Sequence, residues 1–255
     1  MIERVWLTQM RAEYAANEFG NEDQRAIVAR EEALGELRSV TGIVNGTPRH
    51  DVVKTIAEYA DELVSEAKAI LRFPRALSKR EQMIMNMLGM EVLDVGGETI
   101  ADLKLKNPNL LDVIDDSFED ELYASYGTKI ALNRPDLLEI SGTLKLDKPM
   151  QIGAVELFSQ PFEEGSQTGV KAIMLPAALL IQADLAYMRL HEDNHILPEG
   201  RAIRTLDGGL DKDFFAIRRG ESYSVLSYPP MGINRIGAVP GLVFYHQDKL
   251  IDSAI

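Results

Sequence analysis

The periodicity of the apolar residues changes near Gly96-Gly97, and this change constrains the fold more than any other feature of the chain. Before the glycine pair, apolar residues recur at steps of three or four, as on one face of an α-helix. After it, alternating segments are separated by proline and glycine turns, as in a succession of strands. Runs of helices followed by runs of strands are typical of α+β proteins. We therefore predict an α+β fold, with a helical region over 1–95 and a β-rich α+β region over 96–255.

The first region is predicted to form an N-terminal helical bundle. Its third helix, which Asp51 would cap, has the most regular apolar spacing. Ser78 and Glu81 have the spacing of a capping box, which would open the fourth helix. The predicted helices span 2–19, 22–40, 52–71 and 79–90.

The second region is predicted to contain strands in succession, with one interrupting helix. Pro176 suits the first turn of that helix, which would run to about Leu190. Strands that follow one another without intervening helices argue against a doubly wound nucleotide-binding fold. The predicted strands span 137–146, 152–159, 170–175, 214–217, 222–228, 233–239 and 242–246.

The composition excludes several classes of site and partner. The chain has no cysteine, which excludes a disulfide scaffold, a cysteine zinc site, an iron–sulfur cluster and a thiol nucleophile. The net charge is -13, and the basic residues are scattered, so nucleic acid and anionic membranes would repel the protein. No signal peptide and no run of about 18 apolar residues is present. We expect a protein of a virion or of the cytoplasm that does not enter a membrane.

One segment matches a catalytic motif, the HExxH of zinc hydrolases, at His191-Glu192-Asp193-Asn194-His195. Two histidines four apart on one helical face can bind one zinc ion, and the glutamate then polarises the metal-bound water. His191 and His195 would be the metal ligands and Glu192 the catalytic residue. Glu199, Asp207 or His246 could supply a third ligand, and no spacing selects among them.

The same segment is also typical of a helix end. Asp193 and Asn194 form helix interiors poorly, and Pro198-Glu199-Gly200 stops any helix within a turn of His195. We therefore interpret the segment as a polar helix end that leads into a loop, with both histidines near the surface. Zinc catalysis is kept as the alternative, and no metal or other cofactor is otherwise predicted.

The stretch Leu77-Ser78-Lys79-Arg80-Glu81-Gln82 resembles the opening of a LuxR-type helix-turn-helix. This resemblance implies a DNA-binding regulator whose recognition helix would be 110–121. That segment carries Asp112, Asp115, Asp116, Glu119, Asp120 and Glu121. Six carboxylates would be repelled by phosphates, so we interpret 79–90 as a capped bundle helix. The acidic run lacks EF-hand spacing and is interpreted as a solvated face, with a basic partner surface as the alternative.

No other catalytic or nucleotide-binding motif is present. Gly96-Gly97 and Gly208-Gly209 fit neither a dinucleotide fingerprint nor a Walker loop and are interpreted as turns. The nucleophile motif G-x-S-x-G is also absent. Apolar segments punctuated by proline, at 228–233 and 238–245, instead look like arms or edge strands that pair with another subunit.

A helical front, a β-rich back, acidic charge and no cysteine together resemble structural proteins of tailed-phage particles, especially capsid and neck or head–tail connector subunits. The resemblance implies a homo-oligomeric shell or ring, with further copies and other structural proteins as partners. Our leading hypothesis is a non-enzymatic, self-associating structural protein. The alternatives are a zinc-dependent hydrolase that uses His191, Glu192 and His195, and a helix-turn-helix DNA-binding regulator.

Overall fold

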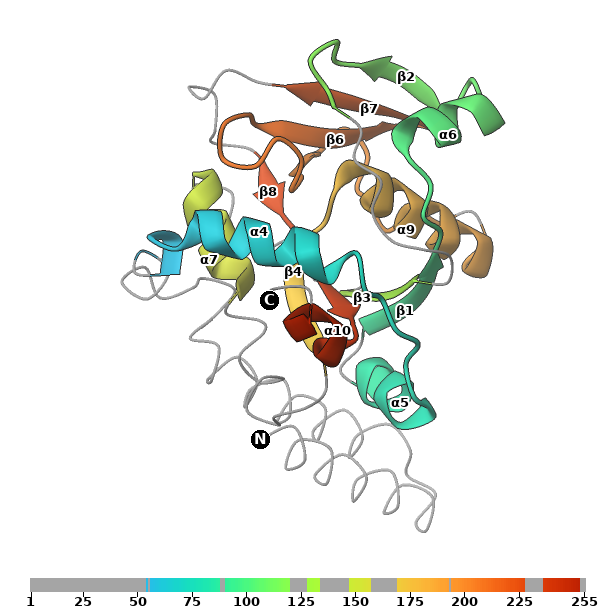
Figure 1. Ribbon diagram of the computed structural model, residues 1–255. Coiled ribbons are helices and arrows are strands. Elements are labelled where there is room, and N and C mark those ends of the chain that lie inside the picture. Colours follow the sequence, from blue (N-terminus) through green and yellow to red (C-terminus); the bar gives the residue numbers. More distant parts are fainter. Residues whose placement is uncertain are drawn as a thin grey trace, which may run out of the picture.

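A buried helix between two open β-sheets forms the framework of the protein in the computed structural model (Figure 1). The structure describes residues 54, 56–87, 90–119, 128–133, 147–156, 169–192, 194–227 and 236–252. The buried helix is α9, Ala177–Leu190. It packs on one side against the four-stranded sheet and on the other against the five-stranded sheet.

The four-stranded sheet is antiparallel throughout, with strand order β1-β3-β9-β4. Its strands come from distant parts of the sequence: β1 is Met90–Val95, β3 is Thr128–Asn133, β4 is Val170–Met174 and β9 is Pro240–Phe244. Strand β9 lies in the interior of the sheet, where all five of its residues are buried. This sheet can therefore form completely only when segments from residue 90 to residue 244 have come together.

The five-stranded sheet is mixed, with strand order β2-β7-β6-β5-β8. Strands β6 (Phe214–Arg219) and β7 (Ser222–Ser227) form a hairpin, and β5 (Ala202–Arg204) pairs antiparallel with β6. The two outer strands, β2 (Leu111–Ile114) and β8 (Gly237–Ala238), run parallel to their neighbours.

The remaining described helices are short. They are α4 (Ala60–Ile70), α5 (Lys79–Met87), α6 (Ile100–Lys106), α7 (Lys148–Glu156) and α10 (Gln247–Asp252). Helices α4 and α5 precede β1, α6 and α7 lie between strands, and α10 follows β9. Helix α4 packs against α7, which packs against β4. In the described part of the chain, no helix has the length and apolarity needed to cross a membrane.

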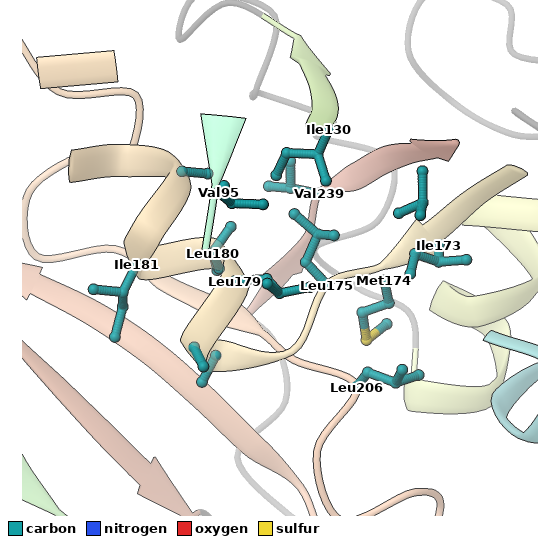
Figure 2. Close-up of a cluster of buried hydrophobic side chains, with 14 of the residues drawn as sticks. Val95, Ile130, Ile173, Met174, Leu175, Leu179, Leu180, Ile181, Leu206 and Val239 are labelled. Atoms are coloured by element: carbon teal, nitrogen blue, oxygen red, sulfur yellow. The ribbon is translucent and has the colours of Figure 1, made fainter. Parts of the chain in front are cut away.

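The core gathers around the beginning of α9. Leu179, Leu180 and Ile181 are consecutive and each at most 1% exposed, so the first half of this helix is buried on all sides rather than along one stripe. Figure 2 shows Leu179 and Leu180 among side chains of the four-stranded sheet, including Val95 and Ile130. The framework is therefore organised around a helix whose first half contacts protein on every face.

The predicted fold class is wrong, because the described helices are scattered among strands and do not form a bundle that precedes them. Residues 90–95, at the end of the predicted helical region, form strand β1, which pairs with β3. The segment shows no clear alternation of apolar and polar residues, so its strand is set by pairing with β3 rather than by a local pattern. The predicted helices 2–19 and 22–40 lie outside the described residues.

The predicted strand 152–159 is wrong over its described part, where the chain forms helix α7. The Asp147 carboxylate accepts the Met150 backbone N–H at 3.0 Å, which is how an N-cap opens a helix. An aspartate followed two residues later by a proline, as in Asp147-Lys148-Pro149, is typical of a helix start. The predicted strand 137–146 lies outside the described residues.

Several local predictions are confirmed. Helix α9 begins directly after Pro176 and ends at Leu190. Ser78 and Glu81 form the predicted capping box, with the Glu81 N–H 3.2 Å from the Ser78 hydroxyl and the Ser78 N–H 2.8 Å from the Glu81 carboxylate. Strands β4, β6, β7, β8 and β9 overlap predicted strands. Strands β1, β2, β3 and β5 were not predicted.

Gly169, at the start of β4, should be far less replaceable than Gly220 in the β6–β7 turn. Both have positive φ, which costs an alanine about 1–2 kcal/mol. A Cβ on Gly169 would also overlap the Tyr245 carbonyl oxygen, whereas a Cβ on Gly220 meets open space. We expect Gly169→Ala to reduce the free energy of unfolding by about 1–3 kcal/mol more than Gly220→Ala in urea denaturation. Equal effects would contradict the close packing of Gly169 against Tyr245.

Candidate functional site

The HExxH residues do not lie on one helical face. Helix α9 ends at Leu190, and His191 is its C-cap with φ -125° and ψ 36°. Glu192 has a positive φ of 50°, so the backbone leaves the helix within the motif. The spacing of four residues therefore does not place the two imidazoles one helical turn apart.

The two histidines contact different carboxylates. The His191 ring stacks on Tyr187 with centroids 4.1 Å apart, and its Nε2 lies 3.5 Å from Glu91 of strand β1. His195 Nδ1 lies 2.8 Å from Asp184 Oδ2 inside the protein. His191 is 36% exposed and His195 is 14% exposed, so only the first has a surface-like environment.

The three candidate third ligands are also engaged elsewhere. The Glu199 carboxylate accepts the Gly220 N–H at 3.3 Å, and Asp207 accepts the Ala177 N–H at 2.7 Å. His246 lies 4.0 Å from Asp248. Among the residues that the structure describes, no three histidine, aspartate or glutamate side chains come together in a way that could hold a metal ion.

The carboxylate of Asp184 accepts several hydrogen bonds in the interior of the protein. Its side chain, on helix α9, is fully buried and accepts four hydrogen bonds. Oδ1 accepts the backbone N–H groups of Ile196 and Leu197 at 2.6 and 2.9 Å. Oδ2 accepts the Tyr223 hydroxyl at 2.5 Å and His195 Nδ1 at 2.8 Å. One carboxylate thus joins α9, the loop that follows it and strand β7.

The two side chains that bind Asp184 are protonated on the atoms that face it, so both act as hydrogen-bond donors. A carboxylate is only an acceptor, so the bond to His195 requires the proton to be on Nδ1. Burial and the adjacent Asp184 carboxylate raise the pKa of Tyr223 above its usual value, which keeps its hydroxyl protonated. All four contacts therefore point donors at one buried negative charge.

A second buried cluster surrounds the beginning of α7. Lys148 Nζ donates to the carbonyl oxygens of Asp207 and Lys212 at 2.9 and 2.8 Å. The Arg204 guanidinium donates to Gln151 Oε1 at 2.7 Å and to Asp213 at 2.8 Å. Gln151 in turn donates to the carbonyl of Ile236. The cluster connects α7, the loop between β5 and β6, and the residue that precedes β8.

The charges in this cluster are perturbed by burial. Burial lowers the pKa of Lys148 to about 8, because the nearby Asp213 and Asp207 compensate only part of the lost hydration. Burial also raises the pKa of Asp207, against the hydrogen bond from the N-terminal N–H of α9. Both groups are held by main-chain contacts rather than exposed to a cleft.

Lys171 on strand β4 forms a third tie between elements. Its ammonium lies 2.7 Å from Glu66 on α4 and 3.0 Å from Glu156 at the end of α7. Burial alone would lower the pKa of Lys171, but the Glu156 and Glu66 carboxylates outweigh burial and raise it. The lysine stays charged and holds two helices against the sheet.

The segment predicted as a recognition helix has a different structure in its described part. Residues 111–114 form strand β2, and Asp115 begins a turn. The Asp115 carboxylate accepts hydrogen bonds from the hydroxyls of Ser227 at 2.5 Å and Ser117 at 2.7 Å, which lower its pKa. Part of the acidic run is therefore structural.

Sequence reasoning missed the residues of the three buried networks. One signal was present for Asp184, because an aspartate stands among Leu179, Leu180, Ile181 and Tyr187 in an otherwise apolar helix. A charged residue in such a helix is buried only if it is hydrogen-bonded or paired. No comparable signal marks Lys148 or Lys171, whose partners are distant in sequence.

The chain matches no known protein-family model, no curated protein and no solved structure. An inference of function for this protein therefore rests on the chemistry of its own residues. That chemistry places buried charges at the junctions between helices and strands.

Asp184→Asn should destabilise the protein strongly, because an amide NH₂ would face one or more of the donors now held by the carboxylate. We expect a loss of at least about 3 kcal/mol in the free energy of unfolding, and about 1–2 kcal/mol for Tyr223→Phe, which removes one donor. Urea denaturation measures both. The exposed Asp211→Asn is the control, with a change within about 0.5 kcal/mol. A wild-type-like Asp184→Asn would contradict the role of this carboxylate.

Lys148 should make stability rise with pH above its native pKa. Between about 8 and the ordinary value of 10.5, the unfolded chain holds a proton that the native protein has released, so stability increases with pH. The increase should be at most about 3 kcal/mol. We expect it to be reduced in Lys148→Met and retained in Lys249→Met, an exposed control, when urea unfolding is compared at about pH 7.5 and 9.5. Parallel pH profiles in wild type and Lys148→Met would contradict the prediction.

Proposed function

We propose that this protein is a non-enzymatic, self-associating structural protein. The proposal rests on one observation: the buried charged side chains bind other parts of the same chain. Asp184, Lys148 and Lys171 each connect separate helices, strands or loops of the same chain. Groups of this kind in an enzyme are typically poised in a cleft, where a substrate can reach them.

The hydrogen bonds that these buried groups make support a role in which the protein keeps a fixed shape. The Asp184 oxygens accept four donors, and Lys148 donates to two carbonyl groups. Such networks, when fully hydrogen-bonded, rigidify a core and specify one arrangement of its elements. A subunit that must transmit forces or keep a fixed shape within an assembly needs that property.

The sheets support self-association. Both are open, so each ends in strands with one unpaired side unless other parts of the protein cover it. Pairing with a second subunit is one way in which natural proteins cover an edge. The resemblance of the sequence to tailed-phage structural proteins leads us to propose a shell, neck or head–tail connector as the assembly, with copies of this chain and other structural proteins as partners.

Light scattering coupled to size-exclusion chromatography tests the proposal. We expect purified protein to elute as a particle whose mass is a multiple of that of one chain. Its mass should be unchanged after removal of divalent metals by a chelator, because no metal is part of the proposed assembly. A stable monomer at all concentrations, including those above about 100 μM, would contradict self-association.

A further inference from the structure

We draw no further inference here: the strongest candidate, the side of strand β2 that faces away from β7 together with the exposed Val113, carries none because nothing in the described part of the chain shows what covers it.

Discussion

The buried carboxylate of Asp184 is the interaction on which the arrangement of the two sheets depends. Moving a carboxylate into the interior costs several kcal/mol unless donors replace its hydration. Here four donors do so, and they come from the loop after α9 and from strand β7. Asp207 accepts the N–H of Ala177 at the beginning of the helix. Because α9 packs against both sheets, holding its middle and its beginning fixes the position of one sheet relative to the other.

Buried charged side chains also join the elements around α9. Lys148 joins α7 to the loop between β5 and β6, and Lys171 joins β4 to α4 and α7. Each contact bridges elements that are far apart in sequence, and each becomes favourable only when the elements are in place. An unpaired buried charge is costly, so alternative packings of these helices are disfavoured. The polar groups thereby specify one arrangement of an apolar core that would tolerate others.

The sequence predicts those elements that are determined by neighbouring residues, and it does not predict those that depend on contacts between distant residues. Pro176 and the apolar run after it predict α9, and the predicted strands 214–217 and 222–228 correspond to β6 and β7. Strand β2 could not be predicted from an acidic segment, because its stability comes from pairing with β7, more than a hundred residues away. The HExxH spacing implied a site only if the helix continued past His191. The hydrogen bonds that draw residues 195–197 back to Asp184 depend on a tertiary contact that the motif does not encode.

A framework fixed in this way has consequences for assembly. Association is weakened when side chains or loops must be ordered at an interface, and a preorganised edge avoids most of that cost. The β2 main chain is already set by β7, by the Tyr223 N–H bond to Leu110, and by the hydroxyls that hold Asp115. The edge thus presents a strand whose main chain is held in place by its neighbours. Strand β7, which pairs with β2, also carries Tyr223, the donor to the Asp184 carboxylate on α9.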